Sequence, residues 1–150
     1  MKQTSFSVVL AAAGLALEFA AVVYSMTVEG GHVRWDRLFV GAATDIVLGA
    51  LTMLLGAAVV AKLASISFGE FGPAAIKLLA VYLFPVGVGT LIGVLTSGIL
   101  GWILAGIVLV VMFRWLFDLT GIEITVCVVM TAVARIVSLV GMAVVLGSLF

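Results

Sequence analysis

Five long apolar runs, separated by short connections, are the feature that most constrains this chain. Only 9% of its 150 residues are charged, whereas a soluble domain carries roughly 25%. Each run is close to the ~20 residues that a helix needs to cross the hydrocarbon core of a bilayer. The sequence therefore predicts an all-α fold, a polytopic transmembrane helix bundle forming one domain over residues 1–150. The expected spans are about 5–26, 37–63, 73–95, 99–117 and 121–149.

Local signals place the ends of several helices. The first apolar run continues to Met26, which is longer than the core of a signal peptide, so we expect it to remain as an uncleaved transmembrane helix. Asp36 is a good N-cap for the second helix, and Pro73 suits the first position of the third. Thr120 and Glu123 have the spacing of a capping box, which predicts that the fifth helix begins there.

The basic residues predict an orientation. Five crossings place the two termini on opposite sides of the membrane. Cytoplasmic loops carry an excess of Lys and Arg, so we expect the N-terminus to be cytoplasmic. We expect the membrane to be an inner or plasma membrane. The residues expected on the N-terminal side are Lys2, Lys62, Lys77 and Arg114, against Arg34 and Arg37 on the other.

Three charged residues, Glu18, Asp45 and Arg135, lie well inside apolar runs. Glu18 comes eight residues before the end of the first predicted span, and Asp45 lies eight residues into the second. At 1.5 Å per residue both lie roughly 12 Å from the same membrane face, and Arg135 reaches about the same depth. An unpaired charge at the bilayer centre costs at least ~2.5 kcal/mol. The sequence therefore predicts that the three side chains form an intramembrane ion-pair cluster.

Neighbouring residues favour an inward orientation of these charges. Small residues one turn from the acids would let another helix approach, and hydroxyls near Arg135 would share its donors. These neighbours are Gly14, Gly41 and Gly49 for the acids, and Thr131 and Ser138 for the arginine. Three interpretations follow: a staple that fixes helix register, a proton or ion relay, and a contact with a neighbouring subunit or lipid.

A possible helix break lies in the third run, at Pro85, Gly87 and Gly89. Transporters use discontinuous helices of this kind to bind substrate near the midplane of the membrane. Proline in a membrane helix also commonly gives only a kink. The pattern therefore predicts either an unwound segment or a kinked helix.

Small residues recur every fourth position on two faces. Such stripes allow close backbone approach, so they predict packing within the chain or a face for self-association or a partner. One face, which continues from Gly89, consists of Gly93, Ser97, Gly101 and Ala105. The other, on the first helix, consists of Ala12, Ala16 and Ala20.

The sequence offers few residues for catalysis. His32 has no second His or Cys near it, so we expect no metal site. We find no catalytic or phosphate-binding motif, and we expect neither enzyme activity nor a cofactor. The formal net charge of zero gives no basic patch, so we expect no nucleic-acid partner.

The layout resembles the Yip1-type family of five-helix membrane proteins, and a short bacterial relative is the better analogy. The resemblance rests on the five spans, the short loops, Phe71-Gly72-Pro73 leading into the third helix, and Pro85 within that helix. It implies a role in membrane organisation, trafficking and partner binding rather than catalysis. The chain lacks the long cytosolic N-terminal segment of the trafficking members, which argues against a recruitment role.

Two functions follow from this sequence. The first is a non-enzymatic integral membrane protein that acts as a structural or accessory subunit of a membrane assembly. Its partners would be the lipid bilayer and other membrane subunits, or a second copy of the chain. The alternative is a small transporter or channel component that uses the intramembrane charges.

Overall fold

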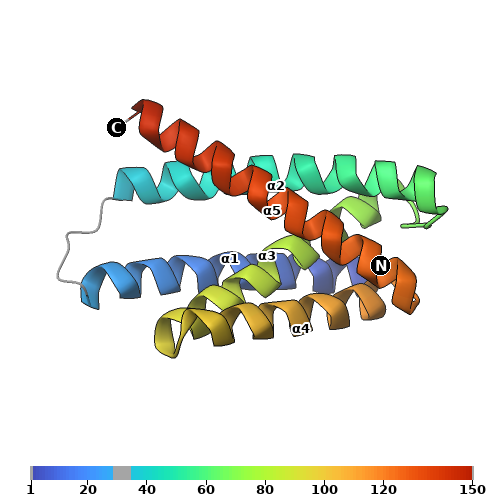
Figure 1. Cartoon of the computed structure of the whole chain (residues 1–150), viewed down its shortest axis with the longest axis horizontal. Coiled ribbons are helices and arrows are strands. Elements are labelled where there is room, and N and C mark those ends of the chain that lie inside the picture. Colours follow the sequence, from blue (N-terminus) through green and yellow to red (C-terminus); the bar gives the residue numbers. More distant parts are fainter. Residues whose placement is uncertain (1, 29–34, 150) are drawn as a thin grey trace.

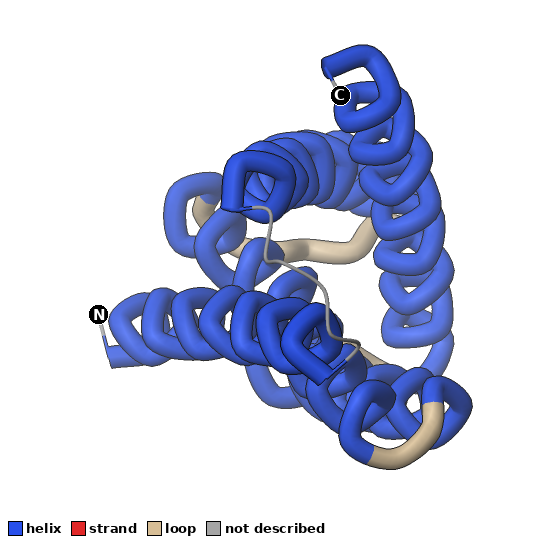
Figure 2. Tube along the Cα trace, turned by 90° about the vertical axis from the view of Figure 1, so that its left-hand side faces the viewer, coloured by secondary structure: helices blue, strands red, loops and turns tan. Residues whose placement is uncertain are grey.

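The computed structural model describes residues 2–28 and 35–149, and these form five helices joined by loops, with no strand (Figures 1 and 2). All five are long and apolar enough to cross a membrane. The prediction of an all-α, five-helix membrane bundle is therefore confirmed, and the predicted spans fall within the observed helices. These are α1 (Lys2–Val28), α2 (Trp35–Ala64), α3 (Phe71–Leu95), α4 (Gly98–Phe117) and α5 (Gly121–Leu149).

Successive helices run in opposite directions, so the N- and C-termini lie at opposite ends of the bundle (Figure 1). Helix α3 is central, because it packs against α1, α4 and α2, whereas α5 packs mainly against α2. Helix α5 crosses α2 diagonally in the same view. The molecule therefore consists of an α1–α3–α4 group and an α2–α5 pair, in contact mainly through α2 and α3 and to a smaller extent through α4 and α5.

The core is built around α3. Its residues 80–83 are all buried, and they include Tyr82, the largest fully buried side chain, while Phe113 of α4 and Met53 of α2 are also fully buried. The outer faces instead expose Val, Ile, Leu and Trp side chains. Because lipid tails are as apolar as these side chains, this arrangement suits a helix bundle surrounded by hydrocarbon.

The helix starts differ in detail from the sequence-based expectation. Helix α2 begins at Trp35, so Asp36 lies in the first turn rather than at the N-cap, where its carboxylate still favours the positive end of the helix dipole. Pro73 is the third residue of α3 rather than the first. The N–H that proline lacks would have no intrahelical acceptor there either, because the first four N–H groups of a helix have none. At the start of α5, the backbone N–H of Thr120 donates to Glu123 Oε2 at 2.7 Å, as expected for a capping box.

Helix α3 continues through Pro85 without interruption from Phe71 to Leu95. Of the two alternatives predicted for the helix break at Pro85, Gly87 and Gly89, the unwound segment is therefore wrong. The two glycines serve helix packing instead. A Cβ on Gly87 would lie 2.1 Å from the carbonyl oxygen of Gly14 in α1. A Cβ on Gly89 would lie 2.9 Å from the carbonyl oxygen of Gly101 in α4. Helices α1 and α4 therefore occupy the space beside α3 that an unwound segment would need.

The predicted close-packing face joins α3 to α4. A Cβ on Gly101 would lie 2.2 Å from the carbonyl oxygen of Gly89 and 2.7 Å from the nitrogen of Gly93, and the Cβ of Ala105 lies 2.7 Å from the position of a Cβ on Gly89. Ser97 departs from the prediction because it is exposed and forms the N-cap of α4, where its hydroxyl accepts from Leu100 N. Small residues therefore bring these two backbones together.

Candidate functional site: an intramembrane charge cluster

The three charges predicted to lie at one depth do meet in the structure. Nη1 of Arg135 on α5 lies 2.7 Å from both carboxylate oxygens of Asp45 on α2. Nη2 of the same guanidinium lies 3.3 Å from Oε1 of Glu18 on α1. Arg135 therefore bridges two helices from a third, which is the arrangement that a guanidinium with several donors favours.

Asp45 is the fully satisfied member of the cluster. Besides the two bonds from Arg135, its Oδ1 accepts from the hydroxyl of Tyr82 at 3.0 Å and from the hydroxyl of Ser138. Ser138 Oγ also lies 3.3 Å from the carbonyl oxygen of Asp45. Because a buried carboxylate is tolerated only when it is paired and hydrogen-bonded, these contacts explain how α2 holds this acid inside the bundle.

Tyr82 is a member of the cluster that the sequence reasoning missed. Its hydroxyl also accepts from Arg135 Nη1 at 3.3 Å, and the guanidinium carbon lies 5.8 Å from the centre of its ring. Gly49 makes room for this ring, since a Cβ there would lie 2.2 Å from a ring carbon. The sequence did carry a signal for this residue. Tyr82 places a phenol hydroxyl in the middle of a largely apolar helix, and such a hydroxyl needs a hydrogen-bond partner when it is buried.

The hydroxyls expected to share the donors of Arg135 have other partners. Thr131 donates to the carbonyl oxygen of Cys127, one turn earlier in α5, and Ser138 donates to Asp45. That expectation was therefore wrong. The physical reason is that Arg135 already directs donors to two carboxylates and to Tyr82, and Ser138 instead serves as a third donor to Asp45.

Glu18 is held much more loosely than Asp45. Its side chain is 21% exposed, compared with 17% for Arg135 and 5% for Asp45. Among the described residues, its one polar partner is Arg135. When all three groups are ionised, the cluster has one carboxylate in excess. Because Asp45 takes the shorter ion pair and two hydroxyls, the uncompensated charge resides mainly on Glu18.

A cavity of about 310 Å³ extends from this cluster between α1, α2 and α5. It leads from Glu18 and Asp45 toward Met26 at the end of α1 and Arg37 at the start of α2. Glu18 and Met26 are eight residues apart on α1, as are Arg37 and Asp45 on α2, and eight residues correspond to roughly 12 Å of helix. The remaining lining residues are apolar: Leu15, Phe19, Val22, Leu38, Gly41, Ala42, Met142 and Leu146.

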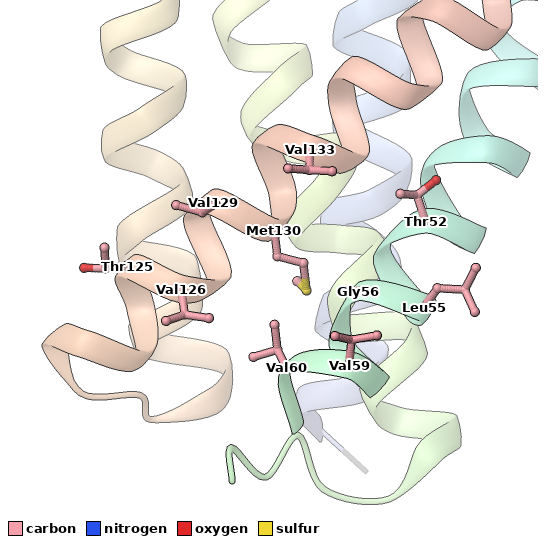
Figure 3. A pocket seen from close by; sticks show the side chains of 10 residues that line it. All are labelled: Thr52, Leu55, Gly56, Val59, Val60, Thr125, Val126, Val129, Met130 and Val133. Carbon is pink, nitrogen blue, oxygen red and sulfur yellow. The ribbon is translucent and has the colours of Figure 1, made fainter. Parts of the chain in front are cut away.

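Two further cavities lie toward the opposite end of the bundle. One, of about 500 Å³, is a groove between α2 and α5 lined by valine, leucine and methionine side chains together with Thr52, Gly56 and Thr125. Figure 3 shows Met130 of α5 pointing into this groove toward Gly56 of α2, where a Cβ would lie 2.6 Å from its Cγ. The other, of about 430 Å³, lies between α2, α3 and their connecting loop. Neither reaches the charged side chains.

No group of three or more His, Cys, Asp or Glu residues that could hold a metal ion occurs among residues 2–28 and 35–149. Of the residues weighed from sequence, His32 and Arg34 lie outside this described part. Within it, every buried side-chain nitrogen and oxygen has a hydrogen-bond partner, as expected for polar groups inside a membrane protein.

Five apolar helices around a paired ionic cluster define the class: this is a multi-pass integral membrane protein. No family model, no curated protein and no solved structure matches this chain.

Proposed function

We propose that the protein is a non-enzymatic subunit of a membrane protein assembly and that α1 provides its contact with a neighbour. The observation that carries the proposal is the outer face of α1, where Ala12, Ala16 and Ala20 are all exposed. These residues follow one another at four-residue spacing and so form a narrow strip along one side of the helix.

The outer faces of α4 and α5 consist mainly of larger, branched side chains. Helix α4 exposes Ile103, Ile107 and Val110, and α5 exposes Val133 and Ile136. Branched side chains keep a neighbouring backbone at a distance, whereas alanines let a second helix approach closely enough for extensive van der Waals contact. A lipid tail gains little from such a strip, so its natural occupant is another transmembrane helix.

The ionic cluster supports a structural rather than a catalytic role. Arg135 lies between the two carboxylates and hydrogen-bonds to both, so Glu18 and Asp45 do not share a proton as an aspartyl-type dyad does. The resemblance to the Yip1-type family points in the same direction, toward membrane organisation and partner binding. We place the protein in an inner or plasma membrane.

The test compares two identical substitutions at exposed alanines. Ala16→Phe fills the α1 strip, whereas Ala132→Phe changes an exposed position of α5 that lies outside it. The mass of each protein is measured after extraction in a mild detergent. We expect the wild-type chain and Ala132→Phe to migrate as a larger species and Ala16→Phe to migrate as a monomer. A wild-type chain that is monomeric and free of partners contradicts the proposal.

One observation favours the alternative, a small transporter or channel component: the 310 Å³ cavity reaches the charged side chains from one end of the bundle. Flux of ions or protons into liposomes that contain only this protein, abolished by Asp45→Asn in a folded chain, would favour transport over the subunit role.

A further inference from the structure

Glu18 lines the cavity and has one carboxylate oxygen without a hydrogen-bond partner among the described residues. Its Oε1 accepts from Arg135 Nη2, while Oε2 has no partner among the described residues. Every fully buried side-chain oxygen in this part of the chain is hydrogen-bonded, so Oε2 is not fully buried, and Glu18 is one of the residues that line the cavity. The oxygen is therefore available to a donor that enters from the cavity.

The charge balance determines which kind of donor fits. Two carboxylates face one guanidinium, and Asp45 is already fully hydrogen-bonded by Arg135, Tyr82 and Ser138. A negative charge left uncompensated at mid-depth in a membrane is costly. A group carrying one positive charge and an N–H donor would neutralise Glu18 and form a charge-assisted hydrogen bond with it.

The walls of the cavity argue against a bare metal ion. Hard cations bind six or more oxygen ligands, but apart from the two carboxylates this cavity is lined by aliphatic, aromatic and methionine side chains together with Arg37. Such a lining instead suits a ligand with an apolar body. A volume of about 310 Å³ lies at the lower end of the range for small-molecule sites, about 300–1,000 Å³.

We propose that this cavity binds a small amphipathic organic ammonium ion. Its nitrogen donates to Glu18 Oε2, and its apolar part packs against Leu15, Phe19 and Met142. Proximity to Arg135 orients the carboxylate, while Asp45 stays engaged with the protein. This inference does not rest on the proposed contact through α1. Leu15 and Phe19 of the cavity lie one turn from Ala12 and Ala16, so the cavity lies beside the alanine strip of that helix.

Arg37 lies at the mouth of the cavity, eight residues from Asp45 along α2. Its exposed charge lies near the aqueous surface, where water and salt screen it, and Asp36 beside it has the opposite sign. The guanidinium therefore does not cancel the attraction of a cation to Glu18 at the inner end.

The experiment measures binding of radiolabelled 2-phenylethylammonium to the full-length protein in lipid nanodiscs, with 2-phenylethanol as the uncharged competitor. Three variants are compared. Glu18→Gln removes the charge. Ala42→Phe fills the cavity from its wall and leaves the cluster intact. Ala43→Phe, the adjacent exposed position outside the cavity, is the matched control.

We expect saturable binding to the wild-type chain and to Ala43→Phe. Glu18→Gln should weaken it by about tenfold or more, the effect of losing one charged hydrogen bond. Ala42→Phe should weaken it to a similar extent by occupying the volume, and 2-phenylethanol should not compete. The proposal is overturned by an absence of saturable binding, by equal binding to the Ala42→Phe variant, or by displacement with excess Na⁺ or with the alcohol. Each result is read independently of whether the α1 strip forms oligomers.

Discussion

Arg135 is the residue on which the polar interior depends, because it is the common partner of both buried acids. Its guanidinium joins α5 to Asp45 on α2 and to Glu18 on α1, although α1 and α5 share almost no backbone contact. This side chain thus adds to the contact between α2 and α3, which includes the Tyr82–Asp45 hydrogen bond, in holding the α1–α3–α4 group to the α2–α5 pair. Removing it leaves two carboxylates facing each other in a low dielectric.

We therefore predict that Arg135→Ala lowers the free energy of unfolding by about 3–5 kcal/mol, the usual effect of breaking a buried ion pair. Thermal unfolding in detergent measures this loss. Arg114→Ala, an exposed arginine at the end of α4, is the control and should change stability by less than about 1 kcal/mol. Because the loss comes from unpaired acids, adding Glu18→Gln and Asp45→Asn to Arg135→Ala should recover part of it. Equal losses of unfolding free energy from Arg135→Ala and Arg114→Ala would contradict a structural role for the ion-pair cluster.

At the scale of elements, the central position of α3 depends on glycines that lie opposite neighbouring backbones. Gly87 meets Gly14 of α1, and Gly89 meets Gly101 of α4, so α3 touches a different helix at each of two positions less than a turn apart. Membrane helices associate largely through such close van der Waals contact. The same residues that weaken an isolated helix thus stabilise this bundle.

We predict that Gly87→Ala destabilises the protein by about 1–3 kcal/mol, the range for overpacking a close contact. Its new Cβ would lie 2.1 Å from a backbone oxygen, which cannot move as a side chain can. Gly106→Ala on α4 is the matched control, because nothing lies within 4 Å of its Cβ position. That change should be neutral or slightly stabilising. Unfolding in increasing denaturant compares the two, and a neutral Gly87→Ala would disprove the close contact.

At the scale of the whole molecule, the alternation of five helices separates the basic residues between the two ends. Lys62 ends α2, Lys77 lies near the start of α3 and Arg114 lies in the last turn of α4, so all three share the end of the bundle that holds the N-terminus. Lys77 Nζ also donates to the carbonyl oxygen of Leu116 at 2.9 Å and stabilises the end of α4. Arg37 lies at the opposite end.

We predict from this distribution that the N-terminus faces the cytoplasm and the C-terminus faces away from it. A reporter that is active only in the cytoplasm should therefore function when fused to the N-terminus and be inactive when fused to the C-terminus. The reverse pattern would contradict the orientation, and activity at both ends would contradict five crossings.

Sequence alone was sufficient for the membrane class, the five helices and the choice of Glu18, Asp45 and Arg135 as partners. The reason is that apolar length and the cost of an isolated charge in hydrocarbon are properties of the residues themselves, and depth follows from counting along a helix. Spacing also located the glycines that bring α3 and α4 together.

Only the tertiary structure decided how those residues are used. Tyr82 joins the cluster because Gly49 on another helix leaves space for its ring, and α3 stays helical at Pro85 because α1 and α4 pack against the glycines that follow. The division of charge, with Asp45 saturated and Glu18 open to a cavity, depends on which helices meet and at what angle. These are relations between segments far apart in the chain, and the periodicity of any one helix does not contain them.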